Sequence, residues 1–395
     1  MKIKYFYLVT LVFLFFSCVE KSLEPINEGK GKPDGVTGVD VVPIPGGAVV
    51  SYRIPNTMDL LAVKAVYTIS NGQKREAIAS YYDNTLTLEG LIDTLSHEAQ
   101  LFAISRAQVL SDPVPIAFKP LESSLSKTVK TVSIIPDFSG ATFIWFNEDN
   151  APLTFDFLTT DAHNNMQTVN IFQSIADTTE FTLHGYAPVP RKFGLVISDN
   201  FENASDTIYP LDGLITPFEE NELDKEVMKV MRLDNDTPLN AWGFRDEFLL
   251  DDDPTTPAHS ATGSIPVTFS IDLGKKTKLS RYLLFQRLQG NTYYTNGNPK
   301  NFDVYVCSGT PSLNGFWDEW TLIGNYTVVK PSGLSGNSVT NEDLRIARNG
   351  HEFSFPRDLE PVRYLRFRFP NTSSTWESRN FMCVGELTFF GIYVE

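Results

Sequence analysis

Apolar and polar residues alternate with a period of two along most of this chain. Ala48, Val50 and Tyr52 form one such series, and comparable series recur to about Pro217 and again beyond Arg232. This alternation is typical of strands that bury one face and expose the other. Between these stretches, residues 217–232 are acidic and then amphipathic, which predicts a short linking helix. The pattern as a whole predicts an all-β protein.

An internal repeat organises the first half of the chain. The segment Gly47 to Tyr52 is echoed by Gly140 to Trp145, and Thr87 to Gly90 is echoed by Thr182 to Gly185, both about ninety residues later. Ile104-Ser105 is likewise echoed by Ile197-Ser198. Three landmarks in the same order at nearly one spacing indicate a duplicated unit of seven-stranded sandwich size. We therefore predict two tandem sandwiches over residues 35–120 and 121–216.

The first of these units resembles a fibronectin type III domain. Its segment Val49 to Pro55 is similar to the second strand of that family, with Tyr52 where a core Trp is usual. The second unit keeps the Trp, as Trp145. The resemblance implies immunoglobulin- or fibronectin III-like sandwiches, which mostly act as spacers.

Residues 217–395 contain four further motifs in a fixed order. They are Ile271 to Gly274, Asn298 to Tyr305, Val362 to Phe369 and Gly385 to Gly391. The series resembles the F5/8 type C (discoidin) domain, which implies a galactose-binding-like jelly-roll sandwich. Within the third motif Arg366 and Arg368 alternate with apolar residues, so their face meets solvent or an inter-strand ion pair. We expect both to lie on the sheet surface rather than to bind ligand.

The loop around Asp234 offers oxygen ligands for a metal. It stands where many carbohydrate-binding members of the discoidin-like group hold a structural Ca²⁺, and the matching residues here are Asp234, Asp236 and Glu386. Alternating oxygen ligands on a tight loop suit Ca²⁺. An Asx-rich turn without an ion is the alternative.

Aromatic and polar residues gather in the loops of the same region. Rings offer faces on which sugars stack, and planar polar groups around them bond hydroxyls. Because this family binds ligand at the loop end of the sandwich, we predict a glycan site there, with Tyr293, Tyr294 and Trp376 exposed and Trp242 in the core. The predicted ligand-binding residues are Arg287, Tyr293, Tyr294, Asn296, Trp376 and Arg379.

The first residues of the chain predict export. A basic start is followed by the apolar run Tyr5 to Phe16, which is too short to span about 30 Å of hydrocarbon. Ser17 and Cys18 after it resemble the lipobox of bacterial lipoproteins, in which the Cys is acylated; an ordinary secretory signal is the alternative. We predict a signal peptide over 1–18, a flexible tether over 19–34, and anchoring to the outer membrane, at the cell surface.

The net charge of the sequence and its lack of common catalytic motifs argue against several functions. The 33 basic against 48 acidic residues give a net charge of −15, which disfavours nucleic acid as a partner. The five His are scattered, and neither a phosphate loop nor a Gly-x-Ser-x-Gly elbow is present. Cys307 and Cys383 could pair or remain free thiols. We expect no enzymatic activity.

Taken together, these patterns predict a glycan-binding envelope lipoprotein. Its layout resembles lipoproteins that Bacteroidota place beside polysaccharide-uptake systems, which implies polysaccharide or oligosaccharide as ligand, outer-membrane uptake proteins as partners, and membrane contact only through the lipid. Two alternatives stay open. One is an adhesin or assembly protein that binds another protein, and the other is a carbohydrate-active hydrolase with an unrecognised site.

Overall fold

A computed structural model describes residues 31–57 and 59–394. The predicted signal peptide, acylation of Cys18 and most of the predicted tether lie outside these residues. Within the described part of the chain, we find no helix that is both long and apolar enough to cross a membrane.

Contacts within the chain divide it into two compact units. Of the described residues, the first unit takes those up to Ile135, Thr142–Phe181 and Arg191–Leu214. The second takes Pro136–Ala141, Thr182–Pro190 and Ile215 onward.

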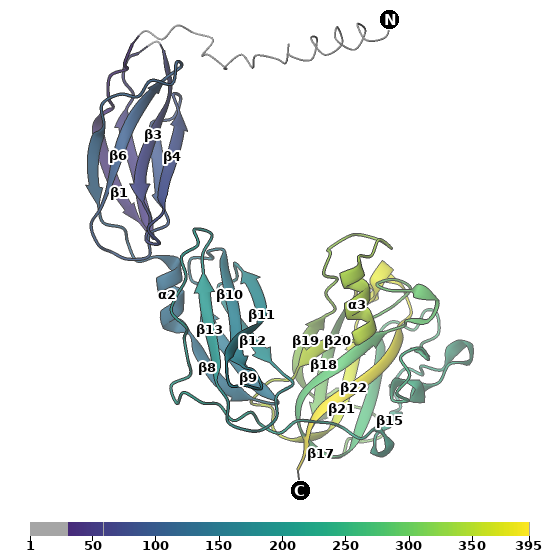
Figure 1. Ribbon diagram of the computed structural model, residues 1–395. Helices are drawn as coiled ribbons and strands as arrows, with labels where there is room; N and C mark the ends of the chain where they lie inside the picture. Colours follow the sequence, from purple (N-terminus) through teal and green to yellow (C-terminus); the bar gives the residue numbers. More distant parts are fainter. Residues whose placement is uncertain (1–30, 58, 395) are drawn as a thin grey trace, which may run out of the picture. The chain divides into compact units, whose positions relative to one another are not determined.

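The first sandwich is built from seven strands in two sheets of order β1-β2-β5 and β4-β3-β6-β7. Ala48, Val50 and Tyr52 point into the core between them, as the alternation predicts. The strands (Figure 1) are β1 (Thr37–Ile44), β2 (Gly47–Arg53), β3 (Leu60–Thr68), β4 (Lys74–Ser80), β5 (Thr85–Glu89), β6 (His97–Ser105) and β7 (Val114–Phe118).

The second sandwich has two three-stranded sheets, β12-β9-β8 and β11-β10-β13. Trp145 occupies its core, 1% exposed, with its ring stacked on Phe155 at 4.2 Å between centroids. The strands are β8 (Ser133–Asp137), β9 (Gly140–Phe146), β10 (Leu153–Thr160), β11 (Met166–Ser174), β12 (Thr178–Leu183) and β13 (Phe193–Ser198). The short helix α2 (Ser124–Thr131), capped by Ser123, precedes them and was not predicted from the sequence.

The two sandwiches share a close backbone approach at matching positions. A Cβ on Gly47 would lie 1.8 Å from the carbonyl oxygen of Leu88, and one on Gly140 would lie 1.6 Å from that of Leu183. Only glycine permits this approach. The repeat read from the sequence therefore corresponds to a shared structural element.

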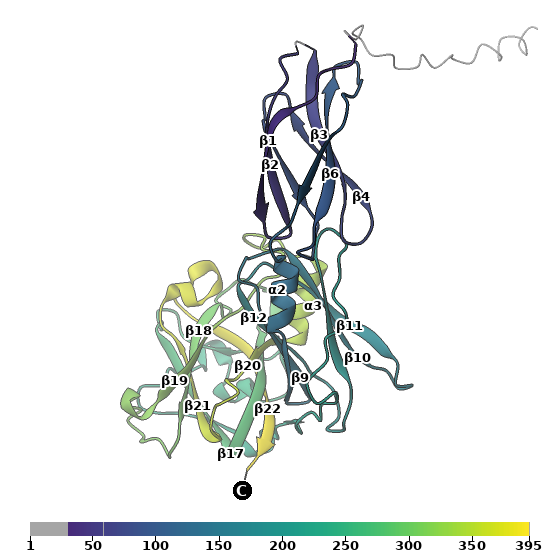
Figure 2. The same ribbon diagram turned by 90° about the vertical axis from the view of Figure 1, so that its left-hand side faces the viewer.

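The third sandwich is a nine-stranded sheet folded over one large core. The 20-residue strand β17 takes part in both layers: its first part pairs with β15 and β21, and its second part pairs with β20 and β22. Figure 2 shows β17 together with β20, β21 and β22. The strands are β14 (Asn221–Glu222), β15 (Lys229–Met231), β16 (Ala258–His259), β17 (Val267–Gln286), β18 (Asn301–Cys307), β19 (Thr321–Thr327), β20 (His351–Ser354), β21 (Val362–Phe369) and β22 (Cys383–Tyr393), with helix α3 (Asn341–Asn349) between β19 and β20.

The predicted linking helix is wrong. Residues 217–232 instead contribute β14, one turn of 3-10 helix at Lys225–Val227, and β15. The apolar residues that suggested a helix, Leu223 and Met228, enter the core of the third sandwich from this irregular segment. Pairing with β22 and β17 satisfies backbone groups that a helix would have satisfied internally.

Arg366 on β21 is buried, which contradicts its predicted place on the sheet surface. The side chain is fully buried, because loops at 233–239 and 313–320 cover this face of the sheet. Its guanidinium lies 4.2 Å from the ring centroid of Trp317. Arg368, one pleat further along, stays partly exposed.

Candidate functional site

Two loops of the third sandwich, 287–298 and 372–381, are joined into one rim. The backbone N–H of Trp376 donates to the carbonyl oxygen of Asn298 at 2.9 Å. One carboxylate oxygen of Glu377 accepts from the backbone N–H of Asn296 at 2.9 Å and from the Arg379 guanidinium at 2.9 Å. The structure thus brings the predicted residues Asn296, Trp376 and Arg379 together, while their role in binding remains a prediction.

Tyr293 and Tyr294 are buried, so the expectation that both are exposed is wrong. Tyr294 is 1% exposed, and its hydroxyl donates to the carbonyl oxygen of Asp343 in α3 at 3.1 Å. Tyr293 is 8% exposed, and its hydroxyl accepts from Arg348 at 3.2 Å. The loop turns here through a positive φ of 52° at Tyr294 and packs both rings inward.

Trp376 is half-buried rather than open. Its ring meets that of Tyr294 edge-on at 5.4 Å, and the ammonium of Lys300 lies 5.0 Å from its centroid. Its contacts with the core and with Lys300 leave less ring area for a ligand than the sequence suggested.

Trp242 reverses the expectation made for it. The sequence placed it in the core, but it is 76% exposed, in a 3-10 turn at Ala241–Gly243. Its backbone has φ of +61°, which is uncommon for a bulky residue and costs about 1–3 kcal/mol. Leu239, 1% exposed, fills the core position instead. The turn residues Asn240 and Gly243 on either side were the sequence signal for a loop tip.

A ladder of stacked rings stands beside this turn. His259 lies between Phe244 and Phe381, with centroid distances of 5.8 and 5.0 Å and interplanar angles of 7° and 19°. Burial lowers the pKa of His259, and the Arg287 guanidinium lowers it further, against a raising effect of the Ser260 carbonyl. The ring is therefore neutral at physiological pH, and the ladder forms an apolar base for the turn.

Arg287 lies against the same ladder, where its guanidinium carbon is 5.4 Å from the Phe244 centroid. The side chain donates to Gln289 at 2.9 Å, and within residues 31–57 and 59–394 no carboxylate lies within ion-pair distance of it. Its Nε is buried without a partner. The Arg287 side chain also donates to Cys383 Sγ at 4.0 Å. Its contact with Phe244 joins the turn at residues 240–244 to the rim, which therefore includes Trp242.

Two of the three predicted calcium ligands, Asp236 and Glu386, are paired with side-chain cations. Asp236 pairs with Arg366 at 2.9 Å, and Glu386 pairs with Lys225 at 3.0 Å. The negative charges of Asp236 and Glu386 are therefore already compensated by two side-chain cations. Among the described residues no group of three or more His, Cys, Asp or Glu side chains is arranged to hold a metal ion.

We expect removal of divalent cations to leave the protein's stability unchanged. Ligands that bind only the folded state raise its stability, so a braced calcium site would show as a loss of thermal stability in EDTA. The expected shift of Tm is below about 1 °C, measured by differential scanning fluorimetry with and without EDTA. A clear rise of Tm on adding CaCl₂ would contradict the arrangement described above.

Cys307 and Cys383 are both buried free thiols, which settles the alternative left open by the sequence. Burial raises the pKa of Cys383 to about 12, against a lowering effect of Arg287. Neither thiol is poised for reaction at neutral pH.

Three family models match consecutive parts of the chain. Each is described as a domain of unknown function: DUF4959 over residues 33–120, DUF5126 over 121–226 and DUF5000 over 251–391. A search of curated proteins finds no match to this chain.

Several solved structures are similar to parts of the chain. A SusE-like protein is 29% identical over 68% of this chain and 98% of its own, with a TM-score of 0.44. A CBM32 module of a family 31 glycoside hydrolase from Clostridium perfringens is 18% identical over 41% of this chain and 93% of its own, with a TM-score of 0.26. A segment of two fibronectin type III domains from chicken tenascin is 16% identical over 46% of this chain and 99% of its own, with a TM-score of 0.23.

Proposed function

We propose that this protein is a cell-envelope lipoprotein that captures glycan through the rim of its third sandwich. The observation that carries the proposal is the exposed Trp242, held in a strained turn two residues before Phe244, whose ring the Arg287 guanidinium contacts. Strained backbone persists where the surroundings enforce it and clusters at ligand sites. An open indole face packs against the C–H face of a sugar ring, and a fixed guanidinium donates to its oxygens.

The role of each rim residue follows from its burial. Trp242 provides the stacking surface, and Arg287 the directed donor. Asn296 and Arg379, tied together through Glu377, form a polar border. The buried Tyr294 and half-buried Trp376 support the loop from below. A shallow platform of this kind buries little ligand surface, so the affinity for a single sugar unit is modest.

In this proposal Cys18 carries the lipid anchor, and the first two sandwiches carry the rim away from the outer membrane. The ligand is a polysaccharide or oligosaccharide bound without chemical change. Outer-membrane uptake proteins are the proposed partners that receive it. The acidic surface suits this role, since it discourages adventitious binding to nucleic acid.

The test is replacement of Trp242 by Ala. We expect affinity for the polysaccharide that binds the wild type to fall at least tenfold, because truncation of an aromatic binding hot spot costs about 1.4 kcal/mol or more. Affinity gel electrophoresis against a polysaccharide panel measures the change.

Phe316→Ala provides the matched control. Phe316 is 60% exposed on another loop of the same sandwich, and we expect its loss to leave retardation unchanged. Unchanged retardation of Trp242→Ala would reject the rim as the binding site. Release of reducing ends from the same panel would show that the protein hydrolyses glycan, and would contradict capture without chemical change.

A further inference from the structure

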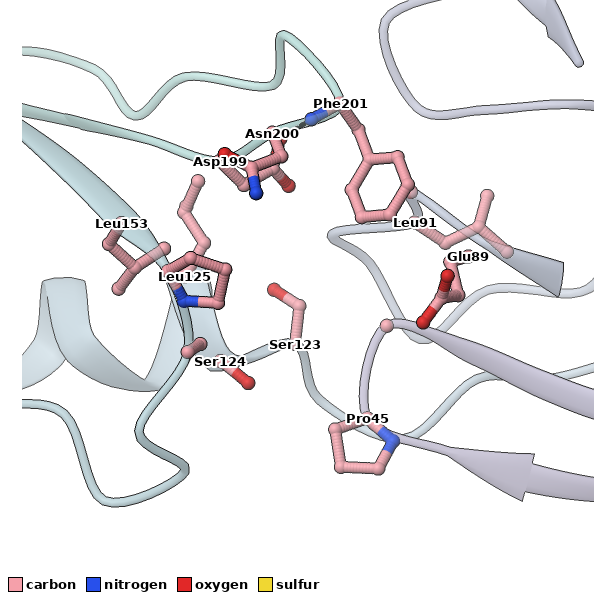
Figure 3. Close-up of a pocket in the computed structure, with 14 residues that line it drawn as sticks. Pro45, Glu89, Leu91, Ser123, Ser124, Leu125, Leu153, Asp199, Asn200 and Phe201 are labelled. Atoms are coloured by element: carbon pink, nitrogen blue, oxygen red, sulfur yellow. Dashed lines mark hydrogen bonds between the residues drawn. The ribbon is translucent and has the colours of Figure 1, made fainter. Parts of the chain in front are cut away.

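The first compact unit contains a cavity of about 360 Å³ where loops of its two sandwiches meet. Glu89 and Pro45 line it from the first sandwich, and Leu153, Asn200 and Phe201 line it from the second. In Figure 3, Leu125 and Leu153 face Phe201 across the opening, and the hydroxyl of Ser123 points into the space between them. This volume falls within the range of small-molecule sites, which occur preferentially at junctions between modules.

The loop that carries Phe201 is fixed on both sides. Within the loop, Asp199 accepts from the backbone N–H groups of Phe201 and Asn203, at 2.8 and 3.1 Å. Towards the first sandwich, Asn71 donates to the carbonyl oxygen of Phe201 at 2.9 Å, and Asn203 donates to that of Gly90 at 3.1 Å. The Phe201 ring packs on the core of the first sandwich.

Gly90 makes this docking possible. Its φ is +96°, and a Cβ there would lie 3.2 Å from the Phe201 ring and 2.9 Å from Ile69. The cavity has a fixed loop on one wall and α2, capped by Ser123, on the other. It is therefore formed before any ligand arrives. Such preorganisation lowers the entropy that binding must offset.

The chemistry of the lining restricts the ligand. None of the residues around the cavity is Lys, Arg or His, and two are acidic. Both carboxylate oxygens of Asp199 are engaged within its own turn. The side chains of Glu89 and Asn200 are exposed and make no hydrogen bond within the described part of the chain, so they can bond a ligand. Arg75 lies 4.8 Å from the Phe201 ring centroid but does not line the cavity, whose two acidic residues disfavour an anion.

We propose that this cavity is a second binding site, for a neutral sugar unit. Its hydroxyls bond the Glu89 carboxylate and the Asn200 amide, and one of its C–H faces packs on the partly exposed Phe201 ring. The site is separate from the rim, so it does not depend on the function proposed above. Two sites on one chain raise the avidity for a polysaccharide that reaches both.

The experiment uses the whole protein with the rim disabled by Trp242→Ala. Neutral gluco-, manno- and galacto-oligosaccharides are titrated by isothermal calorimetry, with oligogalacturonate and glucosamine oligomers as charged probes. We expect Trp242→Ala to retain binding of a neutral oligomer. Adding Glu89→Ala and Asn200→Ala should weaken that binding at least tenfold. Glu98→Ala, an exposed acid on the same sandwich outside the cavity, should not change it.

Every other outcome rejects the cavity, the rim or the neutral sugar. Loss of all neutral binding in Trp242→Ala alone rejects the cavity and leaves the rim standing. Binding that persists in Trp242→Ala and is unchanged by adding Glu89→Ala and Asn200→Ala rejects the cavity and places that binding elsewhere on the chain. A preference for oligogalacturonate or glucosamine oligomers rejects the neutral sugar. Wild-type affinity in Trp242→Ala that disappears with the cavity substitutions supports the cavity and rejects the rim. Circular dichroism melting verifies that each variant is folded.

Discussion

Replacing Arg366 by Met is expected to lower the free energy of unfolding of the third sandwich by about 3–5 kcal/mol. The side chain is fully buried, and it pairs with Asp236, whose side chain is 2% exposed, at 2.9 Å. It also donates to the carbonyl oxygen of Gly315 at 2.7 Å. Removing the cation leaves a buried carboxylate uncompensated, and the Gly315 carbonyl keeps only its bond from the Asn235 amide. Urea unfolding followed by tryptophan fluorescence measures the loss, because Trp317 and Trp320 surround the site.

Arg368→Met is the matched control. Arg368 lies on the same strand and contacts the same Trp317 ring at 5.1 Å, but it is partly exposed and has no buried carboxylate partner among the described residues. We expect a change below about 1 kcal/mol. The double variant Arg366→Met with Asp236→Leu should lose less than Arg366→Met alone, since no unpaired charge remains. A loss below 1 kcal/mol for Arg366→Met would contradict the role assigned to the pair.

The stability of the third sandwich should fall as pH drops below 6.5, through His351. Burial lowers the pKa of His351 to about 4 in the folded protein. Its Nε2 accepts from Gln286, whose side-chain oxygen accepts from the backbone N–H of Tyr294. Between pH 6.5 and 4, His351 is therefore protonated in the unfolded chain but mostly neutral in the folded protein. The stability is complete above pH 6.5 and declines toward pH 4, by about 2 kcal/mol at pH 5.

The measurement is the difference in unfolding free energy between pH 7 and pH 5 for the wild type and His351→Gln. We expect the glutamine variant to lose about 2 kcal/mol less over this interval, whatever its stability at pH 7. His163→Gln, at an exposed turn, should leave the difference unchanged. An equal change in unfolding free energy between pH 7 and pH 5 in the wild type and His351→Gln would mean that the buried imidazole takes up its proton without cost.

The alternation of apolar and polar residues predicted the cores well. Its period of two shows directly which side chains share a face of a sheet. Ala48, Val50 and Tyr52 are buried as expected. The glycine that begins β2 was also visible, through its repeat at Gly140. The predicted domain boundaries remain predictions, although the all-β sandwich architecture is confirmed.

The loops could not be predicted in the same way. The pattern around Arg366 shows which face of β21 it occupies, but not that loops 51 and 131 residues away in sequence would close over that face. The same limit explains Trp242 and Tyr294, whose positions depend on single backbone turns with positive φ. The resemblance to discoidin-like domains suggested the core for Trp242, and a predicted ligand loop suggested exposure for Tyr294; local conformation reversed both.

The docking of Phe201 has a consequence for how this chain can be divided. The two sandwiches are separate units in sequence, yet a ring from the second completes the apolar core of the first, next to Gly90. A fragment that ends at residue 120 would leave that hollow open to water and lose the bonds from Asn71 and to Gly90. The smallest piece with an intact first core therefore extends past Asn203, well into what the sequence presents as its neighbour.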